Sequence, residues 1–223
     1  MEIGPGTGQA TRSLLQRGIA VTAVEPGERL AAYLTEKLRN ESPGLEVVNA
    51  TFEECALESG AYDLILAATS FHWIDPRIRL QKSHDLLREG GALAVISTNQ
   101  IRSSADKGFF DRVQPVYKRH REDKLQELPG PDVTPPEFPD VQASRLFAEP
   151  ELHRYRWDQT YTSQEYADLV RSYSGTQAME PAAQDALIAD LCAVIDAEFG
   201  GSVTRPLVIT LTLARKRPQA SRE

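Results

Sequence analysis

Short, almost uninterrupted apolar runs recur through the first hundred residues, and segments with helical spacing separate them. The apolar runs lie at 19–24, 47–48, 62–68 and 92–97. The helical segments between them lie at 7–17, 30–38 and 80–87. Continuous apolar runs are typical of strands buried on both faces of a parallel sheet. The alternation of strands and helices therefore predicts a doubly wound α/β sheet.

The pattern changes after residue 97. Residues 109–121 have helical character, and five of the chain's fourteen prolines follow within 128–139. Because proline fixes φ and removes a backbone donor, this stretch is predicted to be a loop. Long loops in compact domains are commonly lids. We expect the whole segment 109–147 to be a lid over a binding site and not a core element.

Regular patterns return in the last third of the chain. Residues 152–157 alternate as a strand, and 163–173 and 181–199 have helical spacing, with Thr162 or Ser163 as the first cap. Residues 203–214 alternate apolar and polar positions, which predicts a final strand. We expect 151–214 to complete the same sheet, with 215–223 as a frayed tail.

Composition and charge limit the classes of partner that the chain is expected to bind. The chain has 25 Lys and Arg against 32 Asp and Glu, a net charge of −7, so we expect no nucleic-acid partner. The basic run at 118–121 is interpreted as a solvated helix end. No apolar run reaches the ~20 residues of a membrane span, and no signal peptide is recognised, so we expect no membrane partner. Cys55 and Cys192 are predicted to be buried thiols in a cytoplasmic protein.

A glycine-rich motif carries the chemistry. Residues 2–8 read Glu-Ile-Gly-Pro-Gly-Thr-Gly between a strand end and a helix start. A plain strand-to-helix turn needs one glycine, whereas three let a ligand approach the backbone and the helix N-terminus. Glu25-Pro26 follows at the end of the second strand, where a carboxylate can accept hydrogen bonds from two ribose hydroxyls. Together the two features predict a nucleoside site. The four histidines and two cysteines show no metal-ligand spacing.

These motifs resemble those of the class I S-adenosylmethionine-dependent methyltransferases over about residues 1–100. The matching segments are 2–8, Glu25, 62–65, 71–75 and 87–91. The last segment reads Leu-Arg-Glu-Gly-Gly, with Glu89 where the family usually has proline. The His72-Trp73 pair is similar to the small-molecule branch that includes trans-aconitate methyltransferase. The resemblance implies a Rossmann-like methyltransferase sheet, mostly parallel, with an antiparallel C-terminal strand.

The resemblance also implies a division of the chain and a cofactor. Residues 1–100 would be the S-adenosylmethionine-binding half, 101–150 a variable lid or substrate segment, and 151–214 the C-terminal half. Glu2 would reach the cofactor's ammonium through water, and Glu25 would hold its ribose. The remaining residues that would contact the cofactor are Gly4, Pro5, Gly6, Thr7, Gly8, Pro26, Thr51, Phe52, Glu53, Ala68 and Thr69.

On the acceptor side, Phe71 and Trp73 are expected to form an aromatic wall, with core packing as the other interpretation. His72 is either a general base or a structural histidine, so no catalytic base is assigned. The expected partner is a small-molecule methyl acceptor. Two alternatives stay open: a degenerate, non-catalytic S-adenosylmethionine-binding protein, and a nicotinamide-dependent oxidoreductase. The glycine spacing disfavours the latter, whose fingerprint is Gly-x-Gly-x-x-Gly.

The chain starts inside the glycine motif, with Met1 where a complete first strand would already be ending. We therefore expect a truncated first strand. A shortened central strand has fewer ladder hydrogen bonds and less buried area, so reduced stability and cofactor affinity are expected.

Overall fold

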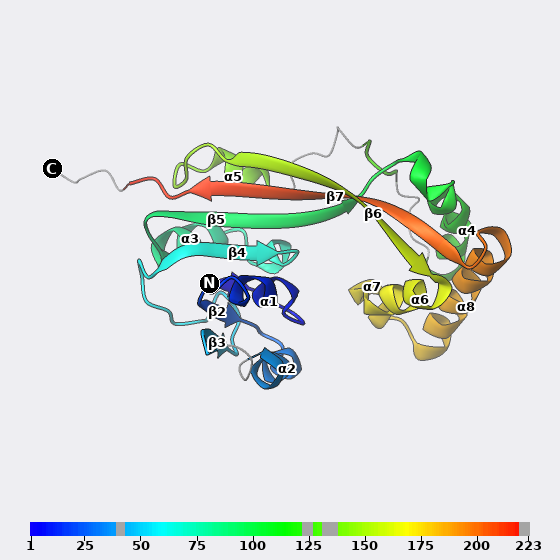
Figure 1. The fold of residues 1–223 in the computed structure, drawn as a ribbon, viewed down its shortest axis with the longest axis horizontal. Helices are drawn as coiled ribbons and strands as arrows, with labels where there is room; N and C mark the ends of the chain where they lie inside the picture. The colour runs from blue at the N-terminus through cyan, green and yellow to red at the C-terminus, as the bar shows by residue number, and fades with distance from the viewer. Residues whose placement is uncertain (39–42, 122–126, 131–137, 219–223) are drawn as a thin grey trace. The chain divides into compact units, whose positions relative to one another are not determined.

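The strands of the protein form one seven-stranded sheet in the computed structural model (Figure 1). The structure describes residues 1–38, 43–121, 127–130 and 138–218. The strand order of the sheet is β3-β2-β1-β4-β5-β7-β6. The strands are β1 (Glu2–Ile3), β2 (Val21–Val24), β3 (Leu45–Val48), β4 (Tyr62–Ala68), β5 (Leu87–Gln100), β6 (Glu151–Thr162) and β7 (Ser202–Arg215).

The helices fall between the strands much as predicted. They are α1 (Gln9–Leu15), α2 (Glu28–Leu38), α3 (Arg79–Leu86), α4 (Phe109–Arg121), α5 (Pro139–Ala143), α6 (Ser163–Ser172), α7 (Ser174–Gln177) and α8 (Pro181–Glu198), with short 3-10 turns η1 (Phe71–Trp73) and η2 (Ser104–Asp106). Boundaries differ where glycine-rich stretches adjoin an element. Thus α1 begins two residues later than expected, and β5 begins at Leu87, before the Gly90-Gly91 pair.

The sheet is parallel from β3 to β5. The two residues of β1 pair in parallel with β2 and β4, so that Glu2 lies opposite both Ala23 and Leu66. β2 with β3 and β4 with β5 are also parallel pairs, and β7 runs against its neighbours (Figure 1). This confirms the predicted doubly wound α/β sheet with its antiparallel C-terminal strand. The strand order reverses direction around β1 and β4, which is where open α/β sheets bind ligands.

Apolar cores lie against the two faces of β2. Val21 and Ala23 pack with Leu34 and Leu38 of α2. Val24, which points the other way, belongs to a larger core that includes residues of α3 and α5. Because both faces of the strand are covered, both sets of alternating positions must be apolar, and this explains the uninterrupted run in the sequence.

Contacts divide the chain into two compact units, which are described separately. Unit 1 contains residues 1–98, 136–154 and 210–223, and unit 2 contains 99–135 and 155–209. The long strands β5, β6 and β7 each contribute residues to both units. Residues 101–135 belong to unit 2 and residues 136–150 to unit 1. The division into 1–100, 101–150 and 151–214 stays a prediction.

Unit 2 is built on a helical core. Residues of α4, α6 and α8 pack together, and Phe109, Val170 and Leu191 are almost fully buried there. The first turn of α6 is closed by a capping box in which Thr162 Oγ1 accepts the Glu165 amide at 3.3 Å and Glu165 Oε2 accepts the Thr162 amide at 2.8 Å. This confirms the predicted helix start.

Several described parts of segment 109–147 are core elements, which contradicts the expectation that the whole segment is a lid and not a core element. Phe109, Val113 and Val116 of α4 are buried in unit 2. Phe138 and Phe147 are buried in the core of unit 1. Prolines determined the loop prediction, but apolar side chains on either side of them determine the packing. Within the predicted loop, 131–137 lies outside the described residues, and the lid there stays a prediction.

Candidate functional site

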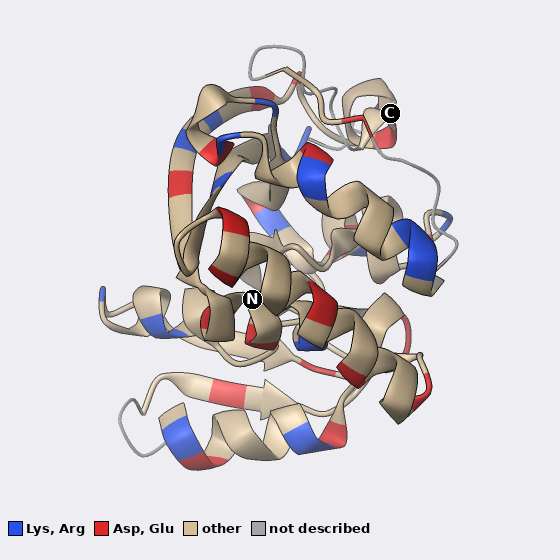
Figure 2. Cartoon of the chain, turned by 90° about the vertical axis from the view of Figure 1, so that its right-hand side faces the viewer, with Lys and Arg blue, Asp and Glu red and all other residues tan. Residues whose placement is uncertain are grey.

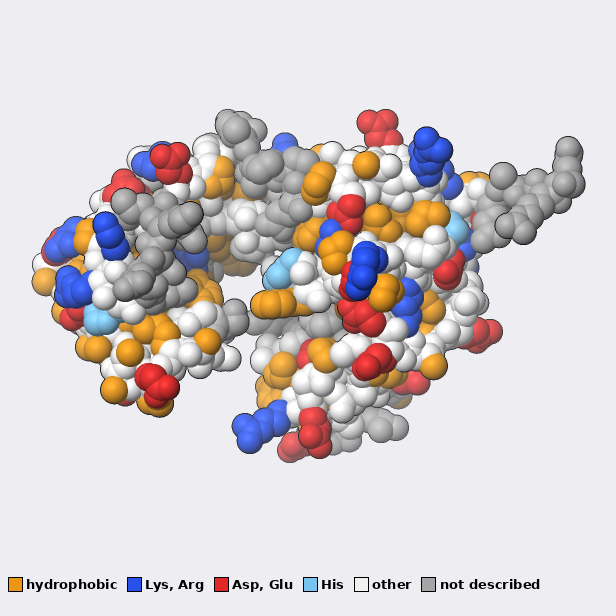
Figure 3. All heavy atoms as spheres, turned by 180° about the vertical axis from the view of Figure 1, so that it is seen from behind, with side chains coloured by type: hydrophobic (Ala, Val, Ile, Leu, Met, Phe, Trp, Pro, Cys, Tyr) orange, Lys and Arg blue, Asp and Glu red, His pale blue; other side chains and the backbone are white. Residues whose placement is uncertain are grey.

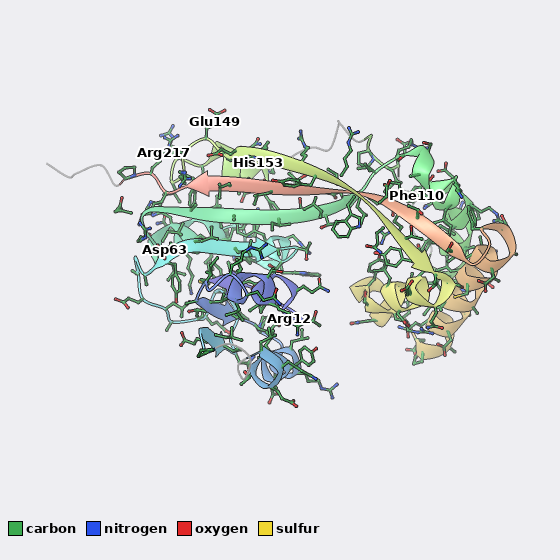
Figure 4. The ribbon with its side chains drawn as sticks, viewed as in Figure 1. Arg12, Asp63, Phe110, Glu149, His153 and Arg217 are labelled. Carbon is green, nitrogen blue, oxygen red and sulfur yellow. The ribbon has the colours of Figure 1, made fainter. Side chains whose placement is uncertain are left out.

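A pocket of about 330 Å³ lies in unit 1 at the carboxyl ends of β1, β2 and β4. Its walls are formed by Ile3, Gly4, Val24, Glu25, Pro26, Thr51, Phe52, Glu53, Ala68, Thr69, Ser70, Trp73 and Ile74. Most of the residues predicted from the sequence to contact a cofactor are therefore brought together here. The amino end of β4, where Asp63 pairs with Arg88, lies at the other end of the strand, away from the pocket (Figure 4).

The glycine loop turns the chain from β1 into α1 through left-handed backbone conformations. Gly8 has φ +80°, and a Cβ there would lie 2.5 Å from Leu34 Cδ2 and 2.7 Å from Leu38 Cδ1. Gly6 has φ +57°, and a Cβ there would meet nothing within 4 Å. Gly8 is thus needed for packing against α2, whereas Gly6 leaves open space at the loop. Pro5, Gly6, Thr7 and Gly8 do not line the pocket wall directly.

Glu25 is buried at the end of β2, with 5% of its surface exposed. Its Oε2 accepts the backbone amide of Gly6 at 3.1 Å, and its Oε1 accepts that of Gly27 at 2.9 Å. Asn49, at the end of β3, donates its Nδ2 to the Glu25 carbonyl at 2.8 Å. The carboxylate therefore stands on the pocket wall in a fixed position, held by backbone from both sides.

Glu2 is not on the pocket wall. Its carboxylate is 1% exposed and accepts a hydrogen bond from Thr11 Oγ1 of α1 at 2.6 Å. Burial raises the pKa of Glu2, and the Thr11 hydrogen bond acts in the opposite direction. The structure thus shows Glu2 joining β1 to α1 beneath the glycine loop, and it does not bring this carboxylate to the pocket as the resemblance implied.

The segment after β3 forms one side of the pocket. Phe52 is 2% exposed, and Lys82 Nζ of α3 lies 5.4 Å from the centre of its ring. The same ammonium donates to the carbonyl oxygens of Glu53 and Cys55, at 3.0 and 2.7 Å. Glu53 Oε1 accepts the Asp75 amide at 2.8 Å. Lys82 and Asp75 therefore hold Phe52 and Glu53 in place from outside the pocket.

β4 ends in strained backbone at the pocket. Thr69 has φ +56°, a conformation that a β-branched residue rarely adopts. Its amide donates to the Ile96 carbonyl at 2.8 Å, which ties the strained residue to β5. The next residue, Ser70, donates its hydroxyl to the Ile3 carbonyl on β1. Such strain is concentrated at functional sites because surrounding contacts must maintain it.

The three aromatic residues after β4 separate into two environments. Phe71 is 1% exposed and packs edge-on against Phe138, and the Arg79 guanidinium lies 4.7 Å from its ring centre. Trp73 is 71% exposed, lines the pocket and stacks obliquely on His72 at 4.8 Å. Phe71 is therefore a core residue, in agreement with the other interpretation, core packing. Trp73 lies on the pocket wall, and its role as an aromatic wall stays a prediction.

The residues that support the pocket through hydrogen bonds to distant backbone were not identified from the sequence. Ser70 and Asn49 each join two strand ends, and Lys82 joins α3 to the segment after β3. None of the three belongs to a recognisable motif. In the sequence, these residues could be found only by their position, just after a predicted strand or on the helix that follows it. Tertiary contacts, which link residues up to 67 positions apart for Ser70 and Ile3, define their role.

Charges of both signs are interspersed over the helices and over the face of the molecule that Figures 2 and 3 show. Two side chains of the basic run at 118–121 contact one carboxylate of unit 2: Arg119 and His120 both lie against Asp190 of α8, at 2.8 and 2.9 Å. Across the described residues, no group of three metal-binding side chains is placed to hold an ion. No described helix is long and apolar enough to cross a membrane.

Comparison with known proteins identifies similar sequences and similar folds. Residues 1–95 match the family model of the methyltransferase domain. An uncharacterized methyltransferase of Mycobacterium tuberculosis is 28% identical over 174 residues, which is 78% of this chain and 63% of that protein. The chain thus spans less than two thirds of the length of the curated relatives it matches first.

Solved structures show the same fold over almost the whole chain. A protein of Anaeromyxobacter dehalogenans described as a type II methyltransferase aligns with a TM-score of 0.63 at 19% identity, covering 97% of this chain and 88% of its own. Phosphoethanolamine N-methyltransferase 2 of Haemonchus contortus, solved with S-adenosylhomocysteine, aligns with a TM-score of 0.54 at 15% identity, covering 97% and 48%. Residues 1–95 therefore match a methyltransferase domain, and the described chain shares its fold with these solved methyltransferase structures.

Proposed function

We propose that the protein is an S-adenosylmethionine-dependent methyltransferase that acts on a small-molecule acceptor. The observation that carries the proposal is the pocket at the point where the strand order reverses. Glu25, the segment 51–53 and the end of β4 converge there beside the glycine loop. The acceptor class follows the branch that includes trans-aconitate methyltransferase. The His72-Trp73 pair supports it, with Trp73 on the pocket wall and His72 stacked against Trp73.

The residues present fit the nucleoside part of such a cofactor. A carboxylate has about four lone-pair sites, and two on Glu25 are used by the Gly6 and Gly27 amides. The remaining sites can accept two ribose hydroxyls. The open space next to Gly6 lets a ligand approach the backbone of the loop. Phe52 and Glu53 are proposed to flank the base, with Glu53 keeping one carboxylate oxygen free of the Asp75 amide.

Catalysis in this site would be mostly positioning. When bound, the cofactor supplies a methyl group already activated by the sulfonium. The chain's own residues then have to hold donor and acceptor in line, which can supply a large part of a rate enhancement. Thr69 and Ser70 fix the floor of the pocket through β5 and β1, and Trp73 offers an aromatic face at its rim. No residue is assigned as a catalytic base.

The proposal is tested first by binding. Calorimetric titration with S-adenosylhomocysteine and with NAD separates the methyltransferase from the oxidoreductase alternative. We expect the first ligand to bind and the second not to. Glu25→Gln should weaken S-adenosylhomocysteine binding, whereas Glu28→Gln, an exposed glutamate three residues later, should leave it unchanged. Binding of NAD alone would contradict the proposal.

The second test is transfer. Cofactor labelled in its methyl group is incubated with the protein and a library of small metabolites, with total RNA as a separate arm. Label in a small molecule supports the proposal. Label in RNA contradicts the acceptor class, and binding of S-adenosylhomocysteine with no transfer to any compound would favour the non-catalytic binding protein.

A further inference from the structure

Arg79, the first residue of α3, is a buried cation in unit 1 with 7% of its surface exposed. Its Nε and Nη2 lie 2.8 and 2.6 Å from Asp140 Oδ2 of α5. Its Nη1 donates to the Phe71 carbonyl of η1 at 3.2 Å. The guanidinium lies 4.7 Å from the ring centre of Phe71 and 5.1 Å from that of Phe138. One side chain therefore joins η1 to α5 and to the residue that precedes α5.

Trp73 reaches the pocket from η1, and burial does not fix its position. The residue is 71% exposed, and its ring lies obliquely against that of His72. The place of the indole on the pocket wall is therefore set by the backbone that carries it. That backbone is one 3-10 turn, whose last hydrogen bond, from the Ile74 amide to the Phe71 carbonyl, is long at 3.4 Å. Turns of this type have poor hydrogen-bond geometry, so contacts from outside the turn matter for its shape.

Arg79 supplies such contacts to both the backbone and the side chain of Phe71. Its guanidinium donates to the carbonyl and lies within the distance at which an aromatic ring attracts a cation. Phe138 completes the contact, because its ring packs edge-on against Phe71 with 5.1 Å between the centres. The first residue of η1 is thus held on two sides by groups that belong to α3 and to the start of α5.

The position of the guanidinium depends in turn on α5. A buried cation is costly without a charged partner, and Asp140 supplies that partner through Oδ2. The other carboxylate oxygen, Oδ1, is buried and accepts no hydrogen bond from the described residues. Neither charge of the pair can therefore be removed without leaving the other poorly compensated. Docking of α5 and placement of η1 are consequently coupled through Arg79.

We propose that Arg79 is a positioning residue for the pocket: it keeps η1, and with it Trp73, in place while α5 supplies Asp140. The inference deepens the proposed function, on which it rests for the identity of the ligand. Residues 138–143, which are all described, do not line the pocket, yet they support its wall through this contact. All the residues involved belong to unit 1.

The test uses Trp73 as its own reporter. Trp73 and Trp157 are the two tryptophans of the chain, so in the W157F background all tryptophan emission comes from Trp73. The decay of fluorescence anisotropy measures how freely the indole moves, and titration with S-adenosylhomocysteine measures affinity. We expect R79Q and D140N each to lower the residual anisotropy of Trp73 and to weaken binding at least threefold. R79K keeps the charge but loses the planar fork, and it should lie between R79Q and the background protein.

F147L is the matched control for a loss of core packing. Phe147 is fully buried in the same core as Phe71, but its ring packs against His84, 6.0 Å away. F147L should lower the free energy of unfolding in urea and leave both the anisotropy of Trp73 and the affinity unchanged. R77Q removes an exposed arginine two residues before Arg79, and it should behave as the background protein does.

Four results would contradict an inference. Equal anisotropy and affinity in W157F with and without R79Q or D140N overturn the positioning role. A lower anisotropy with unchanged affinity overturns it too, because η1 would then move without consequence for the pocket. An equal change in F147L overturns it as an effect of stability alone. Failure of S-adenosylhomocysteine to bind the wild type contradicts the proposed function, while the anisotropy still tests whether Arg79 holds η1. If R79Q does not fold, D140N tests the same contact from α5.

Discussion

Glu25 accepts a hydrogen bond at 3.1 Å from the backbone amide of Gly6, 19 residues earlier in the chain. The carboxylate proposed to hold the ribose is thus also a support of the loop proposed to carry the rest of the cofactor. The same side chain accepts the Gly27 amide before α2. Ligand binding and local stability are therefore joined in one residue.

Glu25→Ala should consequently affect both properties. We expect S-adenosylhomocysteine binding to weaken by about 1.5–3 kcal/mol, the scale of hydrogen bonds to a charged group. The free energy of unfolding should fall by about 1–3 kcal/mol, because two backbone amides lose a buried acceptor. Calorimetric titration and urea unfolding measure the two effects. Unchanged affinity in a destabilised protein would leave Glu25 as a structural residue only.

Gly8 and Gly18 form a matched pair for the glycine loop. Both have positive φ, but a Cβ would clash with Leu34 and Leu38 only at Gly8. Gly18→Ala should cost about 1–2 kcal/mol of unfolding free energy from backbone strain alone. Gly8→Ala should cost about 2–5 kcal/mol, since overpacking adds to the same strain. Equal losses in urea unfolding would show that α2 moves aside without cost.

Substitutions at Phe71 and Trp73 test whether the first residue belongs to the core and the second to the pocket. Phe71→Ala should lower the unfolding free energy by about 3–5 kcal/mol, because a buried ring is removed from its contacts with Phe138 and Arg79. Trp73→Ala should change it by about 0.5 kcal/mol or less, since its side chain is largely exposed. Ligand affinity should respond in the opposite order. A stable Phe71→Ala protein would contradict the core assignment.

Glu2 should make the stability of the protein depend on pH in a recognisable direction. Burial raises its pKa in the folded state above the ordinary value of 4.5, so its contribution is fully present below that value and is lost as pH rises through the folded pKa. Glu2→Gln removes the charge and keeps an acceptor for Thr11. The variant should gain stability relative to the wild type as pH increases from about 4.5, and the two should converge at lower pH. Urea unfolding at several pH values compares them. A constant difference would contradict the raised pKa.

Features that depend on residues close together in the sequence could be predicted, and features that depend on contacts between distant residues could not. The apolar runs of β2 and β4, the capping box of α6 and the glycine turn before α1 are local patterns, and the structure confirms them. The position of Glu25 at the end of a strand could also be predicted from the local sequence. The roles of Glu2 and Phe71 were not, because an acidic or aromatic residue beside a motif can point into the pocket or into the core.

The sequence by itself determined the parallel sheet, the position of the glycine loop and the strand ends that meet at the pocket, because hydrophobic periodicity and backbone-specific residues act over a few positions. Only the tertiary structure decided that Glu2 accepts a hydrogen bond from Thr11, and that α4 and Phe138 belong to two different cores. Those outcomes depend on which distant side chains share a buried volume. Burial and partner identity, more than residue type, set the energy of a charge or a ring.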